Sequence, residues 1–471
     1  MHAVDALPAG PPAESPATAT DGAFGQAEQA NRLADRGRRA YWTVGCTAAG
    51  IVILLIALGI FIERMSFYAP VAALNKRLAA EGLPTTWEAI QADAPHPPAE
   101  LDGTAEWLAF LKAYDPFDAL KPLDAFDPHD PEGSEAAAAE WIKELQALTA
   151  SGKYRHAPYP TSVMVEGDYF LVVLDELSAE YTLGQFLVAR AESQRARGDA
   201  DGAAESLALA LTLAANSKYE PLLLCRLNGT AQLRYAAEGI EPMIVGAELT
   251  PERLIQLQRA LERCDVASYM DSVQLHELAL HRDFATRGQI NHDDFNPLDR
   301  WIARRVLIRQ LDLLDRARLA TALPPAERLA ELAELEETYS RRSEEERPYA
   351  STAVEEFVGP DFRAESVLHE LRFLEAEARR RALIAAIASR RFEQERGTLP
   401  VGWGDLVDYG VDEAPLNPWT ERPMTLRRTG DDSVTIEAPW IEEALAAREA
   451  RGSGDTEREP FEAITLPPRD R

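Results

Sequence analysis

The sequence predicts a mainly α-helical protein: a single transmembrane helix, an α-helical domain of helical hairpins, and a small C-terminal α+β module that ends in a β-hairpin. Three observations predict this fold class. Residues 41–62 contain no Asp, Glu, Lys, Arg or His. From about residue 134 to 396, apolar residues recur at helical spacing. Residues 424–428 and 434–438 then read as two short strands around a Gly430-Asp431 turn.

The N-terminal 40 residues are rich in Ala, Pro, Gly, Ser and Thr. Because such a segment cannot build a core, we expect residues 1–40 to form a disordered tail. Residues 41–64 follow as the transmembrane helix, since about 22 apolar residues span roughly 33 Å at 1.5 Å per residue. Residues 66–70 lack the small-x-small pattern of a signal-peptide cleavage site, which indicates an uncleaved anchor.

The orientation of the span follows from the basic residues beside it. A tight Arg cluster precedes the span, whereas the basic residues after it are spread out. The positive-inside rule therefore places the tail in the cytoplasm and the C-terminal domain outside the cell (inner) membrane. The residues concerned are Arg32, Arg36, Arg38 and Arg39 before the span, and Arg64, Lys76 and Arg77 after it.

Residues 65–133 are predicted to be a juxtamembrane helix and a Pro/Asp-rich linker. The helix carries Leu74 and Leu78 and ends near Gly82, ahead of Pro84. A second short helix is expected around Trp107. The acidic stretch at 115–131 lacks the spacing of a calcium-binding EF-hand loop, so a solvated linker is the preferred interpretation.

Residues 134–360 are predicted to be the helical domain. In the helix after Thr250, that threonine suits the N-cap, Pro251 suits the first turn, and three leucines share one face. Similar apolar stripes occur further along the chain. For residues 163–174 the sequence does not distinguish a helix from a strand. The stripes are Leu254, Leu257 and Leu261, then Leu307, Leu311 and Leu314.

Residues 361–440 are predicted to be a long helix plus the β-hairpin, and residues 441–471 a flexible tail. Val367, Leu371, Leu374 and Ala378 form the apolar stripe of the long helix. Gly397 and Pro400 are expected to end it.

Two segments resemble known families. One resembles a tetratricopeptide-type hairpin, with a Gly-Asp turn and small residues that allow close helix packing, although Gln194 replaces the usual aromatic residue. The resemblance implies that helices stack on one another, and groove binding of a peptide would follow if flanking helices continue the stack. The matching residues are Leu187, Ala191, Gly198, Asp199, Ala203, Ala204, Leu207 and Ala210.

The last 70 or so residues resemble the C-terminal module of type II secretion pseudopilins. The likeness lies in a long helix, a Gly and Pro break, a Pro-Trp loop at 415–419 and a hairpin. A pseudopilin joins this module directly to its processed N-terminal helix, whereas here about 300 residues intervene, so the resemblance implies the local fold and no filament-forming role. The whole arrangement also resembles uncharacterised bacterial single-pass membrane-anchored helical proteins, which implies an architecture and no activity.

Composition restricts the partners. The formal net charge of −29 argues against nucleic acid, because phosphate recognition needs exposed Lys and Arg. The expected partners are the membrane and another envelope protein, and we expect no cofactor and no small-molecule substrate. Cys225 and Cys264 are compatible with one disulfide or with two buried thiols.

The metal-site candidates are His276, Glu277, His281, His292 and Asp293. They resemble the zinc-protease pattern HExxH, but the spacing is HExxxH, which puts the two His about 140° apart on a regular helix. A Glu and His pair on a helix surface explains them better, so we expect neither a catalytic nor a metal site. Two hypotheses remain: a membrane-tethered scaffold or protein-binding module, and alternatively an envelope metal-dependent hydrolase that uses His276, Glu277, His281 and His292.

Overall fold

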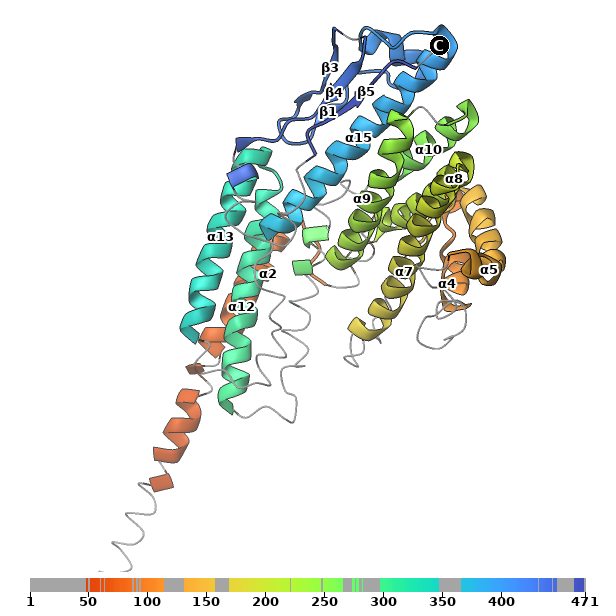
Figure 1. The fold of residues 1–471 in the computed structure, drawn as a ribbon. Helices are drawn as coiled ribbons and strands as arrows, with labels where there is room; N and C mark the ends of the chain where they lie inside the picture. The colour runs from red at the N-terminus through yellow and green to blue at the C-terminus, as the bar shows by residue number, and fades with distance from the viewer. Residues whose placement is uncertain are drawn as a thin grey trace, which may run out of the picture. The chain divides into compact units, whose positions relative to one another are not determined.

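The chain consists mainly of helices, with a small C-terminal module of strands (Figure 1). The computed structural model divides into two units, residues 1–69 and 70–471. It describes residues 48–49, 51–59, 61–62, 64–86, 89, 92, 95–113, 131–156, 169–220, 222–246, 249–265, 273–275, 277–278, 282, 297–346, 366–430, 432–442, 444–446 and 461–469.

The first unit contains the apolar helix. The helix Ile51–Ala80 is long and apolar enough to cross a membrane by length and composition. Its middle contains a π-helical turn, η1 (Arg64–Tyr68), after which α2 (Ala69–Ala80) begins. Ser66 donates its hydroxyl to the Ile62 carbonyl at 2.6 Å. Residues 1–40, predicted to be a disordered tail, lie outside the described residues.

The predicted juxtamembrane helix agrees with α2, which buries Leu74 and Leu78 and is followed by Gly82 at a φ of 74°. The Arg77 guanidinium pairs with Asp315 of α12 (Pro297–Ala320). Arg318 of α12 pairs with Glu81 at 2.9 Å.

The region predicted as a linker contributes to the core. After η2 (Ala99–Leu101), α4 (Thr104–Ala113) buries Trp107, Phe110 and Leu111. The main chain of Tyr154 bonds Leu101 and Gly103, which attaches this segment to residues far along the chain. The short helix predicted around Trp107 is thus present as α4, and its buried side chains belong to the core cluster that also contains residues of the helical domain. The acidic stretch is outside the described residues apart from Pro131, where α5 begins.

Helices α5 (Pro131–Ser151), α7 (Tyr169–Ala196), α8 (Ala200–Asn216), α9 (Leu223–Val245) and α10 (Pro251–Arg263) pack in a stack. The turn between α7 and α8 uses Gly198 at a φ of 80°, and the Asp199 carboxylate accepts the Gly202 N–H at 2.9 Å. The predicted Gly-Asp hairpin is thus present, although the tetratricopeptide resemblance itself stays a prediction. The open choice at 163–174 resolves to helix from Tyr169 onward.

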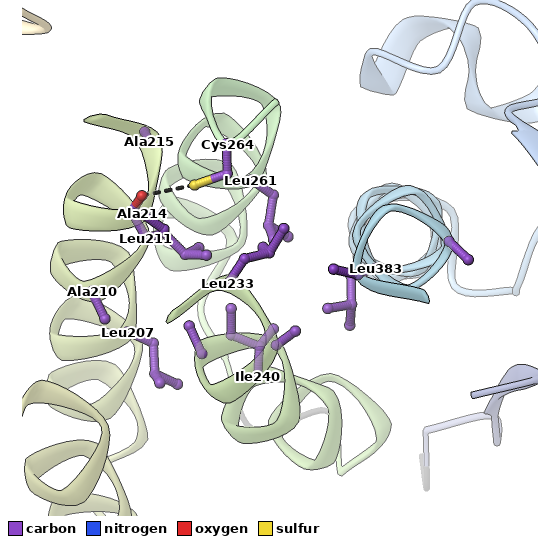
Figure 2. Close-up of a cluster of buried hydrophobic side chains, with 14 of the residues drawn as sticks. Leu207, Ala210, Leu211, Ala214, Ala215, Leu233, Ile240, Leu261, Cys264 and Leu383 are labelled. Atoms are coloured by element: carbon purple, nitrogen blue, oxygen red, sulfur yellow. Dashed lines mark hydrogen bonds between the residues drawn. The ribbon is translucent and has the colours of Figure 1, made fainter. Parts of the chain in front are cut away.

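Small residues let these helices approach closely. A Cβ on Gly229 of α9 would overlap the Ser217 side chain, and one on Gly239 would lie 2.9 Å from Leu207. Between α8, α9, α10 and α15 (Ser366–Arg396) the core consists mainly of alanines and leucines (Figure 2). The thiol of Cys264 donates to the Leu211 carbonyl there, and both Cys225 and Cys264 are buried free thiols.

The predicted apolar stripes are buried with few exceptions. Leu254, Leu257 and Leu261 of α10 are fully covered, whereas Leu314 of α12 (Pro297–Ala320) is half-buried. Thr250 is the N-cap residue of α10, but its side chain does not cap; its hydroxyl donates to Asp201 at 3.2 Å instead. Helix α13 (Pro325–Glu346) pairs with α12 and also contacts α15.

The long helix is α15 (Ser366–Arg396), and Gly397 follows it at a φ of 76°. A short 3₁₀ helix, η7 (Trp403–Tyr409), and a two-stranded ladder of β1 (Leu416–Asn417) and β2 (Arg422–Pro423) come next. The predicted hairpin is β3 (Thr425–Arg428) and β4 (Val434–Glu437), with Leu426 opposite Ile436.

A third strand, β5 (Ala463–Leu466), pairs antiparallel with β4 and completes the order β3-β4-β5. Residues 441–471 were predicted to be a flexible tail, which is wrong for the strand. Ile464 and Leu466 alternate with exposed residues and are buried against the same core as the helices. The helical domain and the C-terminal module therefore share one core cluster.

Candidate functional site

Of the five metal-site candidates, Glu277 lies in the part of the chain that the structure describes. His276, His281, His292 and Asp293 lie outside it. Glu277 is buried, and its carboxylate accepts the Leu223 N–H at 2.8 Å, at the first residue of α9. Desolvation raises the pKa of Glu277 to about 7, and this hydrogen bond opposes the shift. A carboxylate at a helix N-terminus stabilises the unpaired N–H groups there.

Among the described residues, no group of three or more His, Cys, Asp and Glu side chains is placed to hold a metal ion. Because four of the predicted ligands lie outside those residues, the metal-dependent site stays a prediction.

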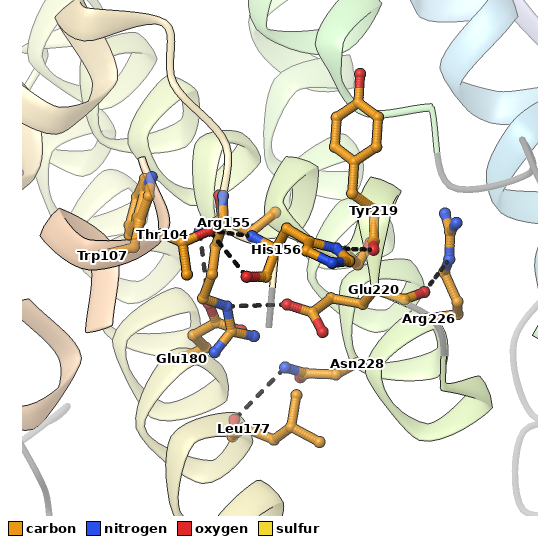
Figure 3. A network of polar contacts seen from close by, with 12 residues as sticks. Thr104, Trp107, Arg155, His156, Leu177, Glu180, Tyr219, Glu220, Arg226 and Asn228 are labelled. Atoms are coloured by element: carbon orange, nitrogen blue, oxygen red, sulfur yellow. Dashed lines mark hydrogen bonds and ion pairs between the residues drawn. The ribbon is translucent and has the colours of Figure 1, made fainter. Parts of the chain in front are cut away.

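A buried charge cluster, Arg155, Glu180, Glu220 and Arg226, is a site that the sequence reasoning missed (Figure 3). Arg155 lies between two carboxylates, at 3.3 Å from Glu180 and 3.1 Å from Glu220. The contact with Glu220 is an ion pair whose N–H direction is not that of a hydrogen bond. Arg226 donates its Nε–H to the Glu220 carbonyl at 3.2 Å.

Polar groups around the cluster connect further elements. Asn216, at the end of α8, accepts the Arg155 main-chain N–H at 3.2 Å. The His156 main chain and the Thr104 hydroxyl exchange two hydrogen bonds, of 2.9 and 2.8 Å. His156 Nδ1 lies 3.0 Å from the Tyr219 carbonyl. Desolvation lowers the pKa of His156, so the ring is held neutral there.

The cluster joins residues 154–156 to α4, α7, α8 and the start of α9. Arg155 pairs with both carboxylates, and pairing of this kind is what buried charges require. All four residues are at most 3% exposed, so the cluster is closed to solvent. Its geometry is that of a structural junction. The available sequence signal was a charge inside an apolar run, as at Arg226 after Leu223, Leu224 and Cys225.

A second site is an open hollow of about 620 Å³ lined by Glu238, Glu241, Pro242, Val245 and Arg379. The first four residues share one face of α9, and Arg379 comes from α15. They are half-buried, whereas Ile240, Met243 and Ile244 on the other face of α9 are buried in the core. We call this feature the α9–α15 hollow.

The lining of the α9–α15 hollow carries two carboxylates and one guanidinium. Arg379 pairs with Glu238 at 3.7 Å, and its guanidinium also lies 5.0 Å from the Phe461 ring centre. Desolvation raises the pKa of Glu241, with Arg379 opposing the shift and Glu238 adding to it. Glu238 is thus the ion-pair partner of the guanidinium and Glu241 feels it only at longer range, beside an apolar wall of proline and valine.

No protein-family model, curated protein or solved structure matches this chain. Functional conclusions therefore depend on the residues of the chain itself.

Proposed function

We propose that this protein is a single-pass, membrane-tethered scaffold of the bacterial envelope whose helical domain binds another protein. The observation that carries the proposal is the exposure of the apolar helix. Its large apolar side chains are 46% to 68% exposed: Ile51, Val52, Ile53, Leu54, Leu55, Ile56, Leu58, Phe61 and Ile62.

Exposed apolar surface of this extent costs free energy in water, at about 25 cal/mol per Å². In a hydrocarbon core the cost disappears, and a helix satisfies its own backbone hydrogen bonds. The clustered Arg residues before the helix support a cytoplasmic N-terminus and an extracytoplasmic domain.

The binding role is supported by the second unit. Its helices and sheet share one core cluster, so elements distant in sequence present a common surface. The α9–α15 hollow lies on that surface, and it combines apolar and charged lining as protein-recognition surfaces do.

Membrane fractionation tests the tether. The full chain is expected to stay in the pellet after alkaline carbonate extraction. The double variant Leu54→Lys, Leu55→Lys is expected to be released, because each Lys near the helix centre costs about 3 kcal/mol. Val401→Lys is the matched control, since Val401 is 69% exposed but lies outside the helix. Release of the unmodified chain would overturn the tether.

Three further measurements test the orientation, the partner and the alternative function. Reporter fusions after Arg471 are expected to show extracytoplasmic activity, and cytoplasmic activity would reverse the orientation. Crosslinking in intact cells is expected to trap a discrete envelope partner. Stoichiometric zinc in the purified protein, lost in His281→Ala, would replace the scaffold with the metal-dependent hydrolase.

A further inference from the structure

The α9–α15 hollow has an amphipathic lining. Pro242 and Val245 provide an apolar wall, and the carboxylates of Glu238 and Glu241 are on the same face of α9. Arginine and lysine side chains have the complementary character, an aliphatic stem that packs on apolar surface and a charged head. The shape and chemistry therefore match a long cationic side chain better than a compact ion.

The charge arrangement favours the same ligand. Arg379 is engaged by Glu238 and by the Phe461 ring. Among the residues that the structure describes, the Glu241 carboxylate has no ion pair within 4.0 Å and no hydrogen bond, although it is half-buried. A partly desolvated carboxylate gains from a cation that arrives with its own hydrogen-bond donors.

A divalent metal ion fits less well. Among the described residues two carboxylates line the hollow, and the guanidinium of Arg379 repels a doubly charged ion more than a singly charged one. A planar guanidinium can instead bond a carboxylate through two parallel N–H groups.

We propose that the α9–α15 hollow receives an arginine side chain from a partner protein, with Glu241 as its ion-pair partner and Pro242 and Val245 as the wall for its stem. The inference rests on the proposed function, because it names the chemistry by which the helical domain recognises its partner.

The test uses the full chain in detergent micelles and two capped tripeptides, Ac-Gly-Arg-Gly-NH₂ and its citrulline isostere, which has the same shape and no charge. Saturation-transfer NMR titrations are expected to show binding of the arginine peptide. The dissociation constant of the citrulline peptide is expected to be at least about tenfold larger. Glu241→Gln is expected to remove that preference. Glu252→Gln on α10, an exposed carboxylate, is the matched control and should leave it unchanged.

Three outcomes would overturn the inference: no arginine-peptide binding up to about 10 mM, a weak-binding limit well beyond the usual millimolar range; equal binding of both peptides; or equal binding by the unmodified protein and Glu241→Gln. Failure here is separable from failure of the scaffold, because the tether and the crosslinked partner are measured independently.

Discussion

The guanidinium of Arg390 donates to the main-chain carbonyl of Ile244 at 2.8 Å, so a side chain near the end of α15 closes the C-terminal end of α9. The same guanidinium bonds the carbonyls of Val245 and Pro467 and pairs with Glu393. The last carbonyls of a helix have no partner within it and need such donors. One buried side chain thus joins two helices and the end of the sheet.

Arg390→Ala is expected to lower the free energy of unfolding by about 3 to 5 kcal/mol, because it leaves several buried acceptors and the Glu393 carboxylate without their donor. Urea unfolding followed by tryptophan fluorescence measures the change. Arg396→Ala is the control on the same helix, since Arg396 is 56% exposed and its pair with Glu395 is on the surface. Equal losses in the two variants would contradict the assignment.

Glu277 is expected to make stability fall as pH rises. Its pKa is raised from 4.5 to about 7 by burial, so the folded state holds a proton that the unfolded state has released between these values. Its contribution is complete below about pH 4.5 and is lost as pH passes 7. The loss amounts to about 3 kcal/mol.

Glu277→Gln keeps an acceptor for the Leu223 N–H and carries no charge. It is therefore expected to stabilise the protein at pH 8 and to have little effect near pH 4, as measured by urea unfolding at both values. Glu220→Gln is the counterpart, because Glu220 pairs with Arg155 and its loss should destabilise at neutral pH. If Glu220→Gln stabilised the protein, Glu220 would not be a favourably paired carboxylate. If Glu277→Gln destabilised the protein at pH 8, the charge of Glu277 would not be unfavourable in the folded state.

Close packing of α8 and α9 depends on Gly229. Gly229→Ala is expected to cost about 1 to 3 kcal/mol, because the added methyl group overlaps the Ser217 side chain and approaches the Ala214 carbonyl at 3.0 Å. Gly404→Ala, where nothing lies within 4 Å of the new methyl group, should be near neutral. Thermal unfolding of both variants distinguishes a packing requirement from a general preference for glycine.

The two described cysteines are expected to be inert in the folded protein. Cys264 is 0% exposed, its thiol donates to Leu211, and burial raises its pKa to about 12. Since the thiolate is the reactive form, labelling at pH 8 should leave Cys264 and Cys225 unmodified until denaturant is added. Mass spectrometry of labelled peptides checks this site by site, and rapid native labelling of either residue would contradict the packing.

Much of the fold could be predicted because helical stripes are local in sequence. The stripe of Leu254, Leu257 and Leu261 and the end of α15 at Gly397 follow from the spacing of apolar residues and from turn chemistry. The hairpin of β3 and β4 was likewise visible in adjacent segments. These predictions required no knowledge of which elements pack together.

The features that were missed all involve residues distant in sequence. β5 is four residues long and pairs across a gap of about 30 positions, so its short apolar alternation carried little local signal. The buried charge cluster combines Arg155, Glu180 and Glu220 from three segments, and each alone is indistinguishable from a surface charge. The α9–α15 hollow could not be predicted from the sequence. Whether one face of α9 is left partly uncovered depends on where the helices packed against α9 end, and the sequence of α9 does not contain that information.

The position of β5 has a consequence for synthesis of the chain. Strand β4 is central in the sheet, and its second neighbour is made only when residue 466 has been added. The carbonyl of Pro467 and the N–H of Arg469 then bond Arg390 and Glu393 of a helix completed about 70 residues earlier. Helices α7 to α10 can therefore pack on one another before the rest of the core is present, whereas one edge of β4 stays unpaired until β5 has been added.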